Sequence, residues 1–436
     1  MLTYDLDRRG KLARYDYLYR CIREDILAGR LTAGEKLPSK RSLASHLQTA
    51  VITVQNAYAQ LEAEGYLYTR EKRGYYVADV ERHPAAPGRA PARSAPQPQR
   101  SWLLDLSSGG SGTEDFPFSV WAKLMRRVLS EEGEALLRAT PPNGADALRR
   151  AIAQHLYRFR GISAAPEQIV VGAGTEYLYN LIVQLLGREA VYGVEDPGYS
   201  KAARIYALGG ARTAPVLVDE GGVSLRSLEM SGAQILHTSP NHQFPTGAVT
   251  PIGRRQSLLR WAEAREGRYI IEDDYDSEFR FTLRPIPTLQ SIDRAGRVIY
   301  VNTFSRTLAP SLRISYMVLP KSLTEHYRAQ LGFYSSTVPA MEQYTLALFL
   351  CGGYFDALII WMRKSYRAQR DAVIDTILQS PLGEHCRVSG EDAGLHFLLT
   401  IDTKCTDHVL RADAEGRGVR LSFLSDFALR PGSAPQ

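Results

Sequence analysis

The sequence has 436 residues, of which 44% are hydrophobic and 23% charged. The length is sufficient for two or three domains with a large core, and the composition is ordinary for a soluble globular protein. No apolar run reaches the roughly 18–20 residues that a membrane-spanning helix needs. The four cysteines are far apart, so they favour neither a disulfide framework nor a zinc site. We therefore expect a cytoplasmic protein without a membrane partner and without a bound metal.

Basic residues are concentrated at the start of the chain. Residues 1–100 hold 17 Lys or Arg and 11 Asp or Glu, a net charge of +6, whereas the remainder is balanced at 36 of each. Such an excess favours a polyanion as the partner of this first quarter. A basic, solvated surface without a partner gives the same asymmetry.

Residues 12–80 predict three helices followed by a hairpin. Apolar residues recur at helical spacing over 15–28, in a short segment after Ser39, and in a third segment that Gly65 ends. Ser39 is a favourable N-cap. Alternating Tyr and Leu residues at 66–68 precede a basic tip at 70–74, and Tyr-Tyr-Val at 75–77 follows it. Three helices and a basic hairpin are the parts of a winged helix-turn-helix, whose third helix enters the major groove of DNA.

The segment GEKLPSKR at 34–41 and the segment EGY at 64–66 resemble the GntR-type winged helix-turn-helix. The resemblance implies that double-stranded DNA is the partner of residues 12–80. Helix starts favour phosphate, and Gln, Asn and the Thr methyl match base edges. Family members commonly have Ser-Arg where this chain has Ala50-Val51, so its site preference is expected to differ. The expected DNA-binding residues are Ser39, Lys40, Arg41, Thr53, Gln55, Asn56, Arg70, Lys72 and Arg73.

Residues 81–103 form a linker rich in Pro, Ala and Arg, without apolar periodicity. This composition predicts a partly extended, semi-rigid spacer. In polyproline form about 19 such residues span some 50–60 Å, enough to reach a neighbouring subunit. A disordered tether with no geometric role fits the composition equally well.

Over residues 104–436, strand-like apolar runs alternate with helical segments. This alternation predicts an α/β fold with a mostly parallel central sheet covered on both faces. Small or polar residues follow several strands, at the edge where open α/β sheets bind ligands. The segment VGAGT at 171–175 suits either a phosphate at a helix start or tight strand–helix packing. The expected strands are 168–171, 190–194, 234–237, 269–272, 298–301 and 314–319.

Two motifs, SPNHQFPTG at 239–247 and IIEDDYDSEFR at 270–280, resemble fold-type I aminotransferases that use pyridoxal 5'-phosphate (PLP). The His-Gln-Phe-Pro version resembles the MocR/GabR-type regulators, which join a GntR-type module to such a domain. The resemblance implies PLP as cofactor, an amine or amino-acid effector, a homodimer and a small C-terminal α+β subdomain. It assigns Asp273 to the pyridine nitrogen and Tyr275 to the ring hydroxyl. The residues that match cofactor-binding positions are Ala173, Gly174, Thr175, Tyr199, Asp273, Tyr275, Ser305, Arg306 and Arg313.

Arg306 stands where the family has the lysine that binds PLP covalently. A guanidinium stays protonated and is not nucleophilic, and transamination needs the lysine both as covalent partner and as base. We therefore expect no catalytic residue, and a DNA-binding regulator that senses PLP or a PLP–amine ligand through an impaired aminotransferase-like domain. A domain that serves only as a dimerisation scaffold, or a working PLP-dependent aminotransferase with an attached DNA-binding domain, are the alternatives.

The C-terminal sequence is a second departure from that family. Family members usually continue through a further strand, which carries a carboxylate-reading Arg, and a final helix. These elements are expected to be missing here. The segment 415–421 predicts a strand of the small subdomain, and Arg420 is the nearest substitute for the missing Arg.

Overall fold

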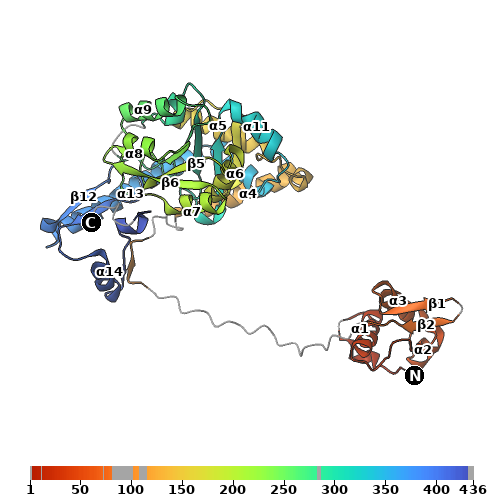
Figure 1. The fold of residues 1–436 in the computed structure, drawn as a ribbon. Coiled ribbons are helices and arrows are strands. Elements are labelled where there is room, and N and C mark those ends of the chain that lie inside the picture. The colour runs from red at the N-terminus through yellow and green to blue at the C-terminus, as the bar shows by residue number, and fades with distance from the viewer. Residues whose placement is uncertain are drawn as a thin grey trace. The chain divides into compact units, whose positions relative to one another are not determined.

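The computed structural model divides into two compact units, residues 1–99 and 100–436 (Figure 1). Each unit is considered by itself. Within the described residues, no single helix is long and apolar enough to cross a membrane; one bent helix pair, Ala340–Cys351 with Tyr354–Gln379, meets the requirement by length and composition alone. The structure describes residues 2–10, 12–71, 73–80, 102–107, 115–281 and 286–430.

The first unit consists of three helices and an antiparallel hairpin, as expected from its sequence (Figure 1). Apolar residues at helical spacing place one face of each helix in a common core, where Leu18, Ile22, Tyr58 and Leu61 are buried. The expected contact Lys72 lies outside the described residues. The elements are a 3-10 turn (Leu6–Arg9), α1 (Arg14–Leu27), α2 (Lys40–His46), α3 (Val51–Ala63), β1 (Leu67–Arg70) and β2 (Gly74–Val77).

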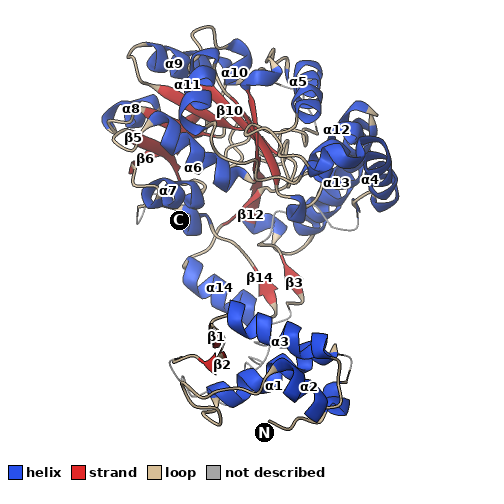
Figure 2. Cartoon of the chain, turned by 90° about the vertical axis from the view of Figure 1, so that its right-hand side faces the viewer, coloured by secondary structure: helices blue, strands red, loops and turns tan. Residues whose placement is uncertain are grey.

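The second unit is organised around an eight-stranded sheet of order β4-β11-β10-β9-β8-β5-β6-β7 (Figure 2). The five strands from β10 to β6 are parallel, whereas β4, β7 and β11 run antiparallel to their neighbours. The mostly parallel sheet and all six expected strands are confirmed. The strands are β4 (Ile169–Ala173), β5 (Val191–Asp196), β6 (Arg212–Asp219), β7 (Gly222–Val223), β8 (Ile235–Thr238), β9 (Tyr269–Asp273), β10 (Val298–Thr303) and β11 (Ile314–Val318).

Strand β6 was not expected from the sequence. It contains Pro215 and has exposed ends, so its apolar pattern is weak. Its outer neighbour, β7, pairs with only two of its residues. A position near the edge of the sheet tolerates a proline that a central strand would not.

Both faces of the sheet are covered by helices, as the continuous apolar strands predict (Figure 2). Ile169 and Val171 pack against one layer while Val170 packs against the other, because successive strand residues point to opposite faces. The first layer contains α4 (Phe118–Glu132), α5 (Asp146–Arg160) and α12 (Ala340–Cys351). Three further helices pack over Leu236 and Val298, namely α8 (Leu225–Met230), α9 (Ile252–Glu263) and α10 (Leu289–Ile292). The second layer contains α6 (Thr175–Leu186), α7 (Ser200–Leu208) and α11 (Lys321–Leu331).

A small C-terminal α+β part follows the sheet. The strand expected over 415–421 is shorter than predicted, since α14 continues to Gly416 and leaves only Val419 and Arg420 extended. These two residues pair with β3, and Arg420 Nη1 lies 3.4 Å from Asp105 Oδ2. Arg420 is thus engaged by a carboxylate of its own chain. The elements are α13 (Tyr354–Gln379), β12 (Cys386–Ser389), β13 (Leu398–Ile401), α14 (Asp407–Gly416), β14 (Val419–Arg420) and β3 (Leu104–Asp105).

Candidate functional site

The start of α2 is capped by its own side chain, as the sequence indicates. Ser39 Oγ accepts a hydrogen bond from the Ser42 amide at 3.1 Å. Lys40 follows the cap, and its Nζ lies 5.5 Å from the centroid of the Tyr75 ring in β2. A cation–π contact of this kind holds a flexible lysine over the wing. The start of α2 and the wing therefore lie side by side in this unit.

Aromatic rings support the basic residue at the wing tip. The Arg70 guanidinium lies 5.5 Å from the Tyr68 centroid and 5.0 Å from the Tyr76 centroid. It also donates a hydrogen bond to the Tyr68 hydroxyl at 3.2 Å. The side chain remains exposed, as does that of Arg73 beyond it. A guanidinium that is held and exposed in this way suits a DNA phosphate or the minor groove.

The outer face of α3 carries two of the three side chains expected to read bases. Gln55 and Asn56 are exposed, whereas Thr53 is half-buried at the edge of that face. The helix begins after Ala50, whose side chain accepts no hydrogen bond from the first turn. Backbone amides at this end are left to solvent or to a ligand.

In the second unit, the best-defined group is the carboxylate of Asp273 at the end of β9. Asp273 is 5% exposed. Its Oδ2 accepts a hydrogen bond from the Tyr179 hydroxyl at 2.5 Å and lies 3.4 Å from His237 Nε2. Its Oδ1 is buried and, among the described residues, has no hydrogen-bond partner. A buried acceptor without a partner is costly, so this oxygen is suited to a donor that a ligand brings.

Tyr179 lies in the second turn of α6 and joins that helix to the Asp273 carboxylate. Burial and the Asp273 charge raise the pKa of Tyr179 well above its usual value, so the hydroxyl stays a donor. Gly174 lies just before α6 with φ of +92°, and a Cβ there would come within 2.5 Å of Arg313 Nη2. The positive φ favours glycine, and the missing Cβ lets the Arg313 guanidinium lie against this backbone. The first turn of α6 and Arg313 thus form one cradle.

Arg313 and Ser305, two residues expected to bind the phosphate, differ in whether another side chain already binds them. Arg313 Nη2 lies 2.6 Å from Glu176 Oε2, so an ion pair already holds this guanidinium at the rim of the cradle. Ser305 Oγ is buried and lacks a hydrogen-bond partner among the described residues. Ala173 donates its amide to Thr337 Oγ1 at 3.0 Å. Of these three residues, only Ser305 has a side-chain hydroxyl without a hydrogen-bond partner among the described residues, so this hydroxyl remains able to bind a phosphate.

Arg306 faces Tyr275. Its guanidinium lies 5.9 Å from the centroid of the Tyr275 ring, and within the described part of the chain it forms no hydrogen bond or ion pair. The Tyr275 hydroxyl donates to the backbone oxygen of His242 at 3.1 Å. Desolvation of that hydroxyl raises the pKa of Tyr275 well above its usual value, and Arg306 opposes the shift. Arg306 is thus a half-buried cation that can receive an anion.

Thr175, the first residue of α6, and Tyr199, directly before α7, are the remaining expected residues. The Tyr199 ring meets the Phe244 ring at 6.3 Å in an edge-on arrangement. Burial raises the pKa of Tyr199, Asp273 raises it further, and Arg306 and Arg313 lower it. Charges from β9 (Asp273) and from the segment after β10 (Arg306 and Arg313) therefore all act on the Tyr199 hydroxyl.

Sequence reasoning missed the side chains that orient this region. Tyr179 and His237 both contact Asp273, yet Tyr179 lies on the apolar face of α6 and His237 lies inside the strand β8. His237 Nδ1 is held in turn by the Tyr206 hydroxyl at 2.6 Å. Each pattern is that of a core residue, so no local signal identifies these contacts.

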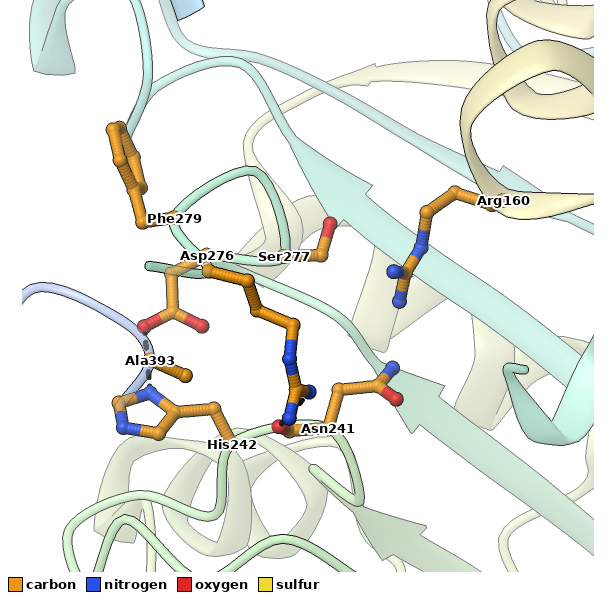
Figure 3. Close-up of a pocket in the computed structure, with 8 residues that line it drawn as sticks. Arg160, Asn241, His242, Asp276, Ser277, Phe279 and Ala393 are labelled. Carbon is orange, nitrogen blue, oxygen red and sulfur yellow. Dashed lines mark hydrogen bonds and ion pairs between the residues drawn. The ribbon is translucent and has the colours of Figure 1, made fainter. Parts of the chain in front are cut away.

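A small cavity next to Tyr275 contains the groups nearest to a metal-binding arrangement (Figure 3). Its volume of about 10 Å³ holds about one water-sized sphere. His242 Nδ1 and Asp276 Oδ2 point toward each other at 2.8 Å. With His396 they place three ligand atoms within 4.8 Å of one another, among the described residues. Arg160 and Arg280 line the same cavity, and their positive charges oppose a cation there.

Two family profiles together match most of the chain. "Bacterial regulatory proteins, gntR family" matches residues 14–77, and "Aminotransferase class I and II" matches residues 103–404. The uncharacterized HTH-type transcriptional regulator YdeL of Bacillus subtilis is 38% identical over 96% of this chain and 91% of its own length. The probable rhizopine catabolism regulatory protein MocR of Rhizobium meliloti is 34% identical over 96% and 88%. The pyridoxine biosynthesis transcriptional regulator PdxR of Corynebacterium glutamicum is 34% identical over 93% and 87%.

Solved structures resemble the second unit. The kynurenine aminotransferase of Pyrococcus horikoshii, in complex with PMP, has a TM-score of 0.67 at 22% identity and covers 76% of this chain and 83% of its own. LysN, an α-aminoadipate aminotransferase of Thermus thermophilus complexed with N-(5'-phosphopyridoxyl)-L-leucine, has a TM-score of 0.65 at 26% identity, over 74% and 83%. The fold of the large unit is therefore that of a class I and II aminotransferase.

Proposed function

Because the chain belongs to the MocR/GabR-type transcriptional regulators, we propose that its aminotransferase-like domain senses PLP, or a PLP adduct of an amine or amino acid, without performing transamination. The chain is a DNA-binding regulator in which a gntR-type module precedes an aminotransferase-class domain. In this proposal the DNA-binding domain comprises residues 12–80, the linker residues 81–103 and the ligand-binding domain residues 104–436.

The single observation that carries the proposal is the orientation of Asp273. Tyr179 and His237 hold one carboxylate oxygen, and the other oxygen is buried without a partner among the described residues. A protonated pyridine nitrogen is a donor that suits such an oxygen. When bound, PLP supplies an aldehyde that condenses with amines and a ring that withdraws electrons. Asp273 would keep that ring cationic.

The remaining residues fit the other groups of the ligand. The free Ser305 hydroxyl and the first-turn amides of α6, after Gly174, suit a phosphate. Arg313 stands at the rim of the cradle, where its positive charge faces the same place. Tyr199 would lie against the ring, and the Tyr275 hydroxyl would bond to the ring hydroxyl.

Arg306 explains why we propose binding without turnover. A guanidinium neither forms the covalent link nor removes a proton at neutral pH. Its position beside Tyr275 and the lack of a partner among the described residues support an ion pair with the phosphate or carboxylate of the ligand. Both roles of the missing lysine are lost together, so the alternative of a working aminotransferase is disfavoured.

The same proposal predicts that the partners of this protein are a second copy of the chain and double-stranded DNA. The protein acts in the cytoplasm as a homodimer, whose two modules contact repeated half-sites of double-stranded DNA. Ser39, Lys40, Arg41, Arg70 and Arg73 would contact the DNA backbone. A ligand that favours one conformation of the large domain shifts the dimer toward it and thereby alters the spacing of the two modules.

A titration with PLP tests this proposal. Binding is followed by absorbance, and borohydride reduction then reveals any covalent attachment, for the wild type, Arg306→Lys and Asp273→Ala. We expect saturable binding to the wild type without covalent trapping, trapping in Arg306→Lys, and lost binding in Asp273→Ala. Asp219→Asn, which removes a carboxylate that is 48% exposed in its pair with Arg254, serves as the folding control.

Two outcomes would replace the proposal. If neither the wild type nor Arg306→Lys binds PLP, the large domain is a dimerisation scaffold. If the wild type converts an amine and a keto acid, the protein is an aminotransferase with an attached DNA-binding domain. Thermal stabilisation by PLP, absent in Asp273→Ala, provides an independent readout that does not depend on activity.

A further inference from the structure

The first turn of α3 presents two aliphatic side chains to solvent. Val51 is 44% exposed and Ile52 is 58% exposed. Neither side chain belongs to the core of the first unit, which α3 enters through Val54, Tyr58 and Leu61. Since no described element of this unit covers them, the core does not explain why they are apolar.

These two side chains share a face with the polar residues expected to meet DNA. Residues three and four apart are neighbours on a helix surface. Gln55 therefore lies one turn beyond both Val51 and Ile52, and Asn56 lies one turn beyond Ile52. All four are exposed. The outward face of α3 is thus apolar in its first turn and carries amides in its second.

The charge of the module argues for DNA as the occupant of this face. The first 100 residues carry a net charge of +6, so a second copy of the same surface would be repelled. Lys40 and Arg70 are held on the neighbouring wing by aromatic rings. A polyanion is attracted to such a surface, and the apolar pair then meets whatever apolar group the major groove offers.

The major groove offers one such group. Thymine alone carries a C5 methyl there, whereas adenine offers the donor and acceptor that Asn and Gln match. Val51 and Ile52 have no hydrogen-bonding group, and Ala50 adds none at the helix start. We propose that Val51 and Ile52 contact thymine methyl groups, so that each half-site carries thymine opposite the first turn of α3. This inference rests on the DNA-binding function of the chain.

The experiment removes methyl groups from DNA without changing its base pairing. Duplexes are first enriched from a randomised pool with the full-length protein. Each thymine of the enriched site is then replaced in turn by deoxyuridine, and binding is measured by fluorescence anisotropy at one salt concentration. The proteins are the wild type, the double variant Val51→Ser/Ile52→Ser and the control Ala59→Ser. Serine matches Val and Ile in helix propensity.

For the wild type we expect one or two thymines per half-site at which deoxyuridine weakens binding about fourfold, which is ~0.8 kcal/mol by the factor of ten per 1.4 kcal/mol. The double variant should bind the original site more weakly and lose this sensitivity. Ala59 is exposed on the same face, about 12 Å along the helix from Val51. Ala59→Ser should therefore keep the wild-type sensitivity.

Two results would overturn the inference. In the first, deoxyuridine has no effect on wild-type binding at any thymine. In the second, the double variant keeps the full sensitivity of the wild type. Failure to enrich any duplex would instead refute DNA binding itself, before a methyl group is tested. If the double variant does not fold, the wild-type scan alone decides, because it needs no variant.

Discussion

Replacing Asp274 by Asn is expected to destabilise the large unit strongly. Asp274 directly follows Asp273, the last residue of β9, and is 2% exposed. Its Oδ2 accepts hydrogen bonds from Arg160 Nη2 and the Tyr300 hydroxyl, both at 2.6 Å, and its Oδ1 accepts one from Asn241 Nδ2 at 2.7 Å. One carboxylate thus joins the end of α5, strand β10 and the loop after β8, directly after Asp273 in the chain.

The magnitude follows from the burial of both charges. The side chains of Arg160 and Asp274 are 7% and 1% exposed. Burial lowers the pKa of Arg160, but Asp274, Tyr300, Glu272 and Glu278 together outweigh burial and leave the pKa above its usual value. A guanidinium stays protonated in proteins, so Arg160 remains charged when Asp274 is replaced, and a buried charge that has lost its partner costs about 3–5 kcal/mol. We expect Asp274→Asn to lower the free energy of unfolding by that amount.

Urea unfolding followed by tryptophan fluorescence measures this change in the full chain. All four tryptophans lie at or beyond residue 102, so the signal reports only the large unit. The matched control is Asp219→Asn, whose partner Arg254 lies at 3.1 Å in a pair with side chains 48% and 26% exposed. An exposed pair of this kind is worth about 1 kcal/mol or less.

The buried pair should also show strong coupling. Arg160→Met combined with Asp274→Leu is expected to cost less than the sum of the single changes, because the double variant leaves no unpaired charge. The reasoning is refuted if Asp274→Asn costs no more than Asp219→Asn, or if the two single changes add.

Three further changes test separate parts of the molecule. Ser39→Ala removes the cap of α2 and should lower the stability of the first unit by about 1 kcal/mol, measured by far-UV circular dichroism, while Ser39→Asn should retain it. Burial lowers the pKa of His155 to about 4. The folded state therefore resists protonation, and stability present above about pH 6.5 is lost as the pH falls toward 4, by up to about 3 kcal/mol. His155→Phe should reduce this loss in unfolding experiments at pH 7.5 and 4.5; an unchanged loss would contradict the assignment. Arg70→Gln should weaken DNA binding alike across sequences and reduce the salt dependence of log K by about one, and a change confined to one base position would argue against a backbone contact.

Local patterns in the sequence determined the type of most elements. Helical spacing identified α1 and α3, Ser39 marked the start of α2, and six apolar runs identified six strands, because these signals depend only on neighbouring residues. Strand β6 escaped because Pro215 and exposed ends weaken its pattern. The sequence alone also determined the most consequential chemical fact, the guanidinium of Arg306 in place of an amine.

The tertiary structure alone decided how the candidate residues are engaged. Tyr179 and Asp273 are 94 residues apart in the chain, and their contact leaves one carboxylate oxygen buried and without a partner among the described residues. Arg313 is held by Glu176, and Arg420 by Asp105, although the sequence presents both as available cations. Residue type is encoded locally, whereas burial, partner and pKa depend on which distant elements pack together. For that reason the sequence could only propose which groups form the candidate site, and the fold decided which of them already have a partner within the described residues.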